Sequence, residues 1–259
     1  MTQPIIEMKN IEKHFGSVIA LAGVSLDVMP GECHCLLGDN GAGKSTFIKT
    51  MSGVHKPTKG EIFFEGKPLE FARPRDSISA GIATVYQDLA MIPLMSVSRN
   101  FFMGNEPLKK VAGISFFDHD HANEVTVNEM KTMGINLRGP DQAVGTLSGG
   151  ERQTVAIARA VYFGAKILIL DEPTSALGVR QTSNVLATVD RVRNKGIAVV
   201  FITHNVRHAL AVGDRFTVLN RGKTHGTANR GEITPEELQD LMAGGQELAT
   251  LEGSLGGTV

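Results

Sequence analysis

Residues 38–46 read Gly-Asp-Asn-Gly-Ala-Gly-Lys-Ser-Thr and fit the pattern G-x-x-x-x-G-K-[ST]. A polyphosphate is held by several backbone N–H groups that point at it together, and glycines keep side chains out of that approach. The apolar run 33–37 predicts a short buried strand before the loop, and the run 46–51 predicts the start of a helix after it. The positive end of that helix adds to the anion site. The stretch therefore predicts a phosphate-binding loop, against the alternative of a chance glycine turn.

Three side chains of this loop have expected roles. Lys44 reaches the β- and γ-phosphates, the Ser45 hydroxyl binds Mg²⁺, and Thr46 lies near the α-phosphate. The other positions of the cradle are Gly38, Asp39, Asn40, Gly41, Ala42 and Gly43. The loop alone thus predicts a bound nucleoside polyphosphate together with Mg²⁺.

The composition excludes several classes of partner. Of the 259 residues, 42% are hydrophobic, 20% are charged and 5% are aromatic, and the net charge is −1. A nucleic-acid partner is not expected, because the chain lacks the basic excess and the aromatic platform that such binding uses. No apolar run is as long as a membrane span, and no secretory signal opens the chain. We therefore expect a cytoplasmic protein that relies on other subunits for any membrane-spanning part.

The two cysteines, Cys33 and Cys35, lie two positions apart and therefore on one face of the predicted strand. A metal site needs a second pair of ligands, and none lies nearby in the sequence. We expect two reduced thiols in the core, as is usual in cytosol.

The chain before the loop predicts an antiparallel ribbon. Residues 5–10 and 18–28 predict extended segments joined by a turn at 13–16. Phe15 lies in that turn. It either stacks on an adenine ring or packs as an ordinary core or rim residue, and from the residues alone the second interpretation is favoured.

The chain after the loop continues with short elements. Residues 60–67 predict a hairpin, 74–80 a short helix, and 81–87 an apolar strand that ends on Gln87. A polar amide at the carboxyl end of a core strand lies where α/β sheets bind their ligands.

The pattern changes between Asp88 and Asp141. A segment rich in Met, Leu and Pro is followed by mixed helical patterns, which predicts an inserted helical subdomain. His119 and His121 lie close enough to suggest a metal site, but polar residues that open a surface helix explain them better.

Residues 147–151 read Leu-Ser-Gly-Gly-Glu and open a predicted helix that runs to about Phe163. Ser148 and Glu151 have the spacing of a capping box. Gly149 and Gly150 lower helix propensity by about 1 kcal/mol each, which suggests that something approaches this helix start closely. The alternatives are a second anion-binding helix N-terminus and a simply well-capped helix.

Two apolar runs end in polar residues. Residues 167–170 predict a buried parallel strand followed by Asp171 and Glu172, and residues 197–202 predict another that ends at His204. Adjacent carboxylates at the end of an apolar strand suggest a cation and a reacting water. With an amphipathic helix over 178–195, the alternation of strands and helices predicts a doubly wound nucleotide-binding architecture.

The last part of the chain predicts a hairpin over 216–227 and a helix capped by Thr234 with Pro235 at its first position. The glycine-rich end, 245–259, predicts a loosely ordered tail.

Together these motifs resemble the ATP-binding subunit of ABC transporters, over about 5–244. Within that family the sequence is most similar to the carbohydrate importers, above all to the fructose-import branch. The resemblance implies a P-loop NTPase (RecA-like) α/β core. The antiparallel β subdomain and the phosphate loop would occupy residues 5–87, and the helical subdomain would occupy residues 88–146. Residues 147–244 would contain the signature helix, the two carboxylates and His204.

The resemblance also implies roles for particular residues. Phe15 would stack on adenine, residues 38–46 would hold the phosphates of ATP, and Ser45, Gln87 and Asp171 would hold Mg²⁺. Catalysis would fall to Lys44, Gln87, Glu172 as general base, and His204 at the γ-phosphate. Ser148, Gly149 and Gly150 would contact the nucleotide bound to a partner subunit.

The chain has one copy of each motif, so the resemblance implies a homodimer that closes on ATP and moves integral membrane permease subunits at the cytoplasmic face of the inner membrane. A groove near Gln87, including 91–95, would receive a permease helix, and a periplasmic sugar-binding protein would act indirectly. Gly178 departs from the family, which usually has Asp there, and this puts tight coupling between the two sites in doubt. The alternatives are an exporter cassette, an importer of another substrate, and a soluble cassette ATPase.

Overall fold

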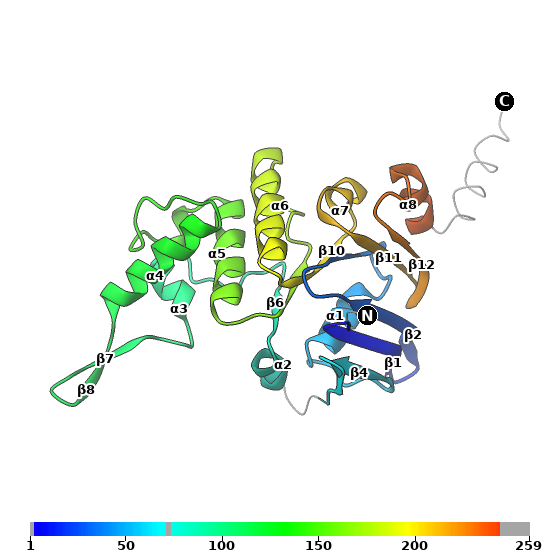
Figure 1. Ribbon diagram of the computed structural model, residues 1–259, viewed down its shortest axis with the longest axis horizontal. Helices are drawn as coiled ribbons and strands as arrows, with labels where there is room; N and C mark the ends of the chain where they lie inside the picture. The colour runs from blue at the N-terminus through cyan, green and yellow to red at the C-terminus, as the bar shows by residue number, and fades with distance from the viewer. Residues whose placement is uncertain (1–2, 71–73, 244–259) are drawn as a thin grey trace.

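A six-stranded sheet forms the centre of the molecule in the computed structural model, which describes residues 3–70 and 74–243 (Figure 1). Its strands lie in the order β12 (Lys223–Asn229), β11 (Arg215–Asn220), β3 (Cys33–Leu37), β10 (Ala198–Thr203), β9 (Ile167–Asp171) and β6 (Ile82–Val85). Neighbouring strands are parallel except β11 and β12. The carboxyl ends of β3, β6, β9 and β10 therefore share one edge.

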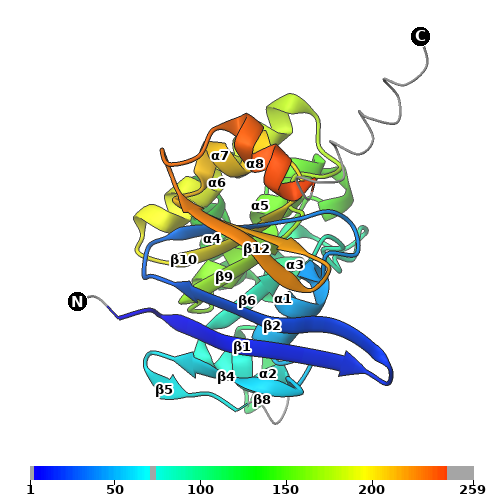
Figure 2. The same cartoon turned by 90° about the vertical axis from the view of Figure 1, so that its right-hand side faces the viewer.

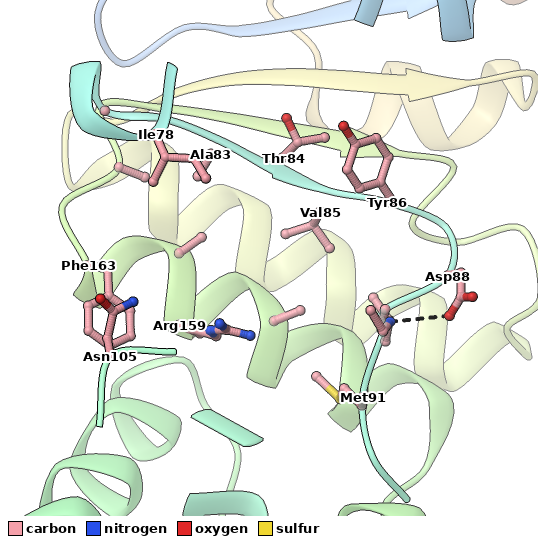
Figure 3. Close-up of a pocket in the computed structure, with 16 residues that line it drawn as sticks. Ile78, Ala83, Thr84, Val85, Tyr86, Asp88, Met91, Asn105, Arg159 and Phe163 are labelled. Atoms are coloured by element: carbon pink, nitrogen blue, oxygen red, sulfur yellow. Dashed lines mark hydrogen bonds between the residues drawn. The ribbon is translucent and has the colours of Figure 1, made fainter. Parts of the chain in front are cut away.

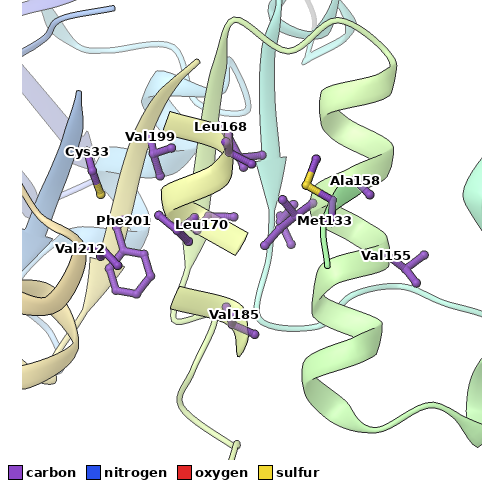
Figure 4. Packing of buried hydrophobic residues seen from close by; sticks show 14 of the residues in the cluster. Cys33, Met133, Val155, Ala158, Leu168, Leu170, Val185, Val199, Phe201 and Val212 are labelled. Atoms are coloured by element: carbon purple, nitrogen blue, oxygen red, sulfur yellow. The ribbon is translucent and has the colours of Figure 1, made fainter. Parts of the chain in front are cut away.

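Side chains on the central strands alternate between two cores. The main helices that cover the sheet are α1 (Lys44–Met51), α5 (Gly149–Tyr162), α6 (Val179–Asn194) and α7 (Val206–Val212). Leu168 and Leu170 of β9 pack in one core with residues of α5 and α6, as Figure 4 shows. Ile167 and Ile169 of the same strand pack in the other core with residues of α1. Apolar residues on both faces explain why this strand is an unbroken apolar run.

A second, antiparallel sheet lies beside the first (Figure 2). Its order is β2 (Val18–Val28), β1 (Ile6–Phe15), β4 (Lys59–Phe64) and β5 (Lys67–Pro68). The predicted turn at 13–16 is wrong in its extent, because β1 continues to Phe15 and only Gly16 and Ser17 separate it from β2. Shifts in pairing register along β1, together with a left-handed backbone at Asn10 (φ 50°), let the strand bend and continue.

The inserted segment contains more than helices. It consists of α3 (Val97–Phe102), β7 (Leu108–Val111), β8 (Ile114–Phe117), α4 (His119–Thr132) and a short 3₁₀ turn, η1 (Val144–Thr146). The β7–β8 hairpin projects from the body of the molecule in Figure 1. This hairpin was not predicted from the sequence. Ala112 and Gly113 at its tip both have positive φ, 51° and 84°, as a two-residue primed hairpin turn requires.

Several predicted elements match the structure. The helix α2 (Pro74–Ala80) has the predicted bounds, and α8 (Pro235–Met242) has the predicted Thr234 cap and first-turn proline. The strand β6 ends at Val85, so Gln87 lies two residues beyond it rather than at its end. The tail at 245–259 lies outside the described residues. None of the helices in the described part of the chain is long and apolar enough to cross a bilayer.

Candidate nucleotide site

A cavity of about 540 Å³ lies at the carboxyl edge of the six-stranded sheet. Its volume falls within the range of about 300–1,000 Å³ that is usual for small-molecule sites. The residues that line it are Val18, Ile19, Ala20, Asp39, Asn40, Gly41, Gly43, Lys44, Ser45, Thr46, Gln87, Asp171, Glu172, Arg221 and Gly222. The fold thus brings the phosphate loop together with the amide and the two carboxylates that follow distant strands.

The glycines of the loop are required by its neighbours within the chain. Gly38 has φ +146°, and a Cβ atom there would lie 2.4 Å from the Leu219 carbonyl oxygen. Gly43 has φ +103° and precedes the first turn of α1, where a Cβ atom would lie 3.0 Å from the Ala20 carbonyl oxygen. Backbone from β2 and β11 therefore crowds the loop, and a bare backbone is needed before any ligand is considered.

Lys44 is the cation at the centre of this site. Its side chain is buried, and its ammonium group donates hydrogen bonds to the carbonyl oxygens of Gly38, at 2.5 Å, and of Asp39, at 3.1 Å. Burial lowers the pKa of Lys44, while the nearby carboxylates of Glu172 and Asp171 act in the opposite direction. The ammonium group is thus held inside the loop, between backbone carbonyls and carboxylates.

Asp171 is the last residue of β9 and Glu172 follows it, but the two carboxylates have different surroundings. Burial and the neighbouring Glu172 charge raise the pKa of Asp171, and Lys44 acts against that rise. The Glu172 side chain is 13% exposed, and its Oε1 accepts a hydrogen bond from Nδ1 of His204 at 2.9 Å. Its Oε2 is buried without a hydrogen-bond partner among the described residues. A buried carboxylate oxygen with free acceptor capacity beside the cavity is suited to bind a water molecule.

The oxygen donors near the loop fit Mg²⁺. The Ser45 hydroxyl, the Gln87 amide oxygen and the Asp171 carboxylate all come from residues that line the cavity. The Gln87 amide nitrogen donates to Ser175 Oγ at 3.3 Å, which leaves the amide oxygen available. Mg²⁺ prefers such oxygen donors, usually one or two carboxylates together with substrate phosphates. Among the described residues, no group of three or more His, Cys, Asp or Glu side chains could hold a metal ion.

Several of the predicted contacts lie outside the cavity lining, namely Phe15 and His204, and Gly38 and Ala42 of the loop itself. Phe15 is 44% exposed at the end of β1, where its ring contacts His55 with ring centres 5.2 Å apart. Val18 and Ile19, across the turn, line the cavity instead and are largely exposed. His204 reaches the site through its hydrogen bond to Glu172 rather than as a lining residue.

Residues 148–150 form the start of α5 and do not line this cavity. The capping box is confirmed, because Ser148 Oγ accepts from the Glu151 N–H at 3.3 Å and the Glu151 carboxylate accepts from the Ser148 N–H at 2.7 Å. A Cβ atom at Gly149 would lie 2.7 Å from Leu177, and one at Gly150 would lie 3.1 Å from the Gln181 carbonyl oxygen. Close packing of α6 and the loop before it is thus one reason for the glycine pair.

The part of the site that comes from the β11–β12 turn was not predicted from the sequence. Arg221 and Gly222 line the cavity, and a Cβ atom at Gly222 would lie 2.5 Å from the Ala20 carbonyl oxygen. The turn at 220–223 was predicted, but no signal in the sequence placed it against the phosphate loop.

The comparisons with known proteins agree with this geometry. A family model described as ABC transporter matches residues 21–175. The chain is 42% identical to a xylose/arabinose import ATP-binding protein of Sulfolobus acidocaldarius, covering 92% of this chain and 93% of that protein. It is 40% identical to a fructose import ATP-binding protein of Rhizobium meliloti, covering 95% of this chain and 96% of that protein.

Solved structures show the same fold. A nucleotide-free ATP-binding cassette from an ABC transporter aligns with a TM-score of 0.80 and 25% identity, over 93% of this chain and 96% of that one. A dimeric bacterial ABC transporter cassette aligns with a TM-score of 0.73 and 25% identity, over 88% of this chain and all of that one. The predicted P-loop NTPase fold, with its antiparallel β subdomain, is confirmed. The chain therefore belongs to the ABC transporter family, as one of its ATP-hydrolysing cassettes.

Proposed function

We propose that this chain is the ATPase subunit of a monosaccharide importer. The observation that carries the proposal is the similarity over nearly the whole chain to two proteins named for sugar import, one for xylose and arabinose and one for fructose. Fructose or a similar sugar is the substrate that we expect. Residues 5–244 would act as one cassette, because the aligned relatives span almost all of this range.

The geometry supports a division of roles within the cavity. Lys44 and the loop N–H groups would bind the phosphates, with Phe15 and the apolar ribbon residues beside it near the adenine. Mg²⁺ held by Ser45, Gln87 and Asp171 would neutralise charge on the β- and γ-phosphates. Glu172, whose Oε2 is buried and unpartnered in the described chain, would orient the attacking water and accept its proton. His204 holds the other carboxylate oxygen in place.

The second half of each site would come from another copy of the chain. Residues 148–150 do not line the cavity of their own chain, and Gly149 packs against the loop at Leu177. Two residues beyond, the Val179 side chain is 91% exposed at the start of α6. An apolar residue this exposed beside a helix N-terminus suits an interface that forms on closure. The solved cassette dimer supports this arrangement.

A permease contact is supported by a second cavity, of about 330 Å³, between β6 and α5 (Figure 3). Ala83, Val85 and Met91 line one side of it, and Ala160 and Phe163 of the α5 region line the other. This mostly apolar cleft suits a short helix of an integral membrane subunit. The segment 91–95 follows directly, and within it Leu94 is 92% exposed. A cassette docked in this way would be peripheral on the cytoplasmic face of the inner membrane, with a periplasmic sugar-binding protein acting indirectly.

Transport assays test this function. Cells that lack this chain should lose ATP-dependent uptake of at least one labelled monosaccharide among fructose, xylose, arabinose and ribose. The wild-type chain should restore that uptake, whereas Glu172→Gln, produced at equal level, should not. Unchanged uptake of every sugar, with altered efflux or altered uptake of another solute, would assign the cassette to an exporter or to another substrate.

A further inference from the structure

Glu172 has an unusual backbone conformation for a residue with a side chain. Its φ is +48°, in the left-handed region that favours glycine. Such a conformation persists only when the surrounding structure holds it, and it is frequent at functional sites. The N–H of Glu172 donates to the Ile202 carbonyl oxygen of β10 at 3.1 Å, which fixes the peptide group that precedes the Glu172 Cα atom.

Ser175 holds the peptide group that follows the same Cα atom. Its backbone N–H donates to the Glu172 carbonyl oxygen at 3.2 Å, and its hydroxyl donates to the same oxygen at 3.0 Å. The hydroxyl oxygen accepts a hydrogen bond from the Gln87 amide at 3.3 Å. One hydroxyl group therefore connects Gln87 to the backbone of Glu172, and consecutive hydrogen bonds of this kind polarise one another.

Gln87 lies between two cavities. It lines the nucleotide cavity, and it also lines a neighbouring cavity of about 470 Å³ together with Leu89, Met91 and Pro93. Leu89 and Met91 also line the cleft between β6 and α5. A change in the segment that follows Gln87 therefore has a short route to the residues around Glu172.

We propose that Ser175 is a positioning residue that couples the Gln87 amide to the backbone conformation of Glu172 and so sets the rate of hydrolysis. The proposal rests on the function proposed above, in which Glu172 is the general base. Ser175 touches neither substrate nor metal in this account and acts through Glu172.

The loop around Glu172 has a separate anchor, so loss of the Ser175 hydroxyl should not unfold it. Thr174 is buried, and its hydroxyl forms a hydrogen bond with Nδ1 of His208 at 3.0 Å. Ser175 itself is exposed, which leaves room for substitution. Ser175→Ala removes both hydrogen bonds of the hydroxyl, and loss of the one to the Glu172 carbonyl oxygen should lower kcat about three- to tenfold. KM for ATP should change little, because no ATP contact is removed.

The experiment measures ATPase kcat and KM for the wild type, Ser175→Ala, Ser175→Thr, Gln87→Ala and the Gln87→Ala/Ser175→Ala double variant. Ser175→Thr keeps the hydroxyl and should restore most of kcat. Ser183→Ala is the matched control, because Ser183 is exposed on α6 and lies away from this chain of hydrogen bonds. Melting temperatures of all variants show whether each one is folded.

The double variant decides the coupling. If Ser175 acts together with Gln87, removal of the Ser175 hydroxyl should lower kcat only slightly further in the Gln87→Ala background. An equal loss from Ser175→Ala in both backgrounds, or wild-type kcat in Ser175→Ala, would overturn the proposal. Glu172→Gln is measured in parallel, and if it hydrolyses ATP at the wild-type rate, the proposed function fails instead. An inactive Glu172→Gln with a fully active Ser175→Ala rejects the positioning role alone.

Discussion

Replacement of Gly178 by Asp tests both the local structure and the proposed dimer. Gly178 is the N-cap residue of α6, with φ −70° and ψ 164°, a conformation that any residue adopts. A Cβ atom at this position would meet no atom within 4 Å. The helix has no side-chain cap and no acidic residue in its first turn. An aspartate should therefore fit without strain and supply both the missing cap and a negative charge at the positive end of the helix dipole.

The size of the effect follows from three contributions. Asp in place of Gly at an N-cap adds a few tenths of a kcal/mol. Loss of glycine freedom in the unfolded chain adds about 0.4–1 kcal/mol, and the dipole interaction adds about 0.3–1 kcal/mol, part of which overlaps with the cap. We expect Gly178→Asp to stabilise the monomer by about 1 kcal/mol, which raises Tm by about 2–4 °C in a chain of this length.

Calorimetry of Gly178→Asp, Gly178→Asn and Gly178→Ala separates these contributions. Asn supplies the cap without the charge, and Ala supplies neither. The Tm should therefore be highest for Gly178→Asp, lower for Gly178→Asn and lowest for Gly178→Ala. ATPase assays on the same proteins should show a changed Hill coefficient for Gly178→Asp, with a smaller change in turnover at a single site. A Tm for Asp no higher than for Ala would refute the capping argument. An unchanged Hill coefficient would count against a cross-dimer contact at this position.

Two further substitutions test the phosphate loop and the surroundings of Glu172. Gly38→Ala places a Cβ atom against a backbone carbonyl, so it should abolish ATP binding in titration calorimetry and lower stability by about 1–3 kcal/mol. Gly164→Ala is the control, because Gly164 also has a positive φ, +87°, but has open space around it, and this variant should still bind ATP. Burial lowers the pKa of His208 in the folded chain. As pH falls past about 6.5, the unfolded chain therefore binds more protons at this residue than the folded chain does, and the free energy of unfolding falls. His208→Gln should therefore lose less Tm than the wild type between about pH 7.5 and pH 5.5, whereas His225→Gln, on the exposed face of β12, should behave like the wild type.

Local signals predicted the elements that depend on local physics. The bounds of α2 were predicted closely, and so was the start of α8, because a proline at the first helical position and a capping box act within one turn there. The extent of β1 was wrong because bulged pairing with its neighbours carries the strand through residues that look like a turn. The β7–β8 hairpin was missed because its short strands, with Leu108 and Ile114 more than half exposed, carry no burial pattern.

The residues of the site also divide into those that local motifs predict and those that only the packing of distant segments places there. Residues in motifs with fixed spacing, such as Lys44 and Glu172, were identified from the sequence, because the chemistry constrains several neighbouring positions at once. Arg221 and the apolar Val18 were missed as lining residues. They reach the cavity only because β2 and the β11–β12 turn fold over the phosphate loop, and that packing is set by contacts between distant segments.

The most direct test is the ATP-dependent association of Glu172→Gln, followed by light scattering with and without MgATP. Removal of the proposed general base should slow hydrolysis by about 10² to 10⁴-fold and so preserve the closed state. The account predicts a monomer without nucleotide and a dimer with MgATP, and it predicts that adding Lys44→Ala abolishes the dimer. A Glu172→Gln protein that binds MgATP but stays monomeric would contradict a site shared between two copies of this chain.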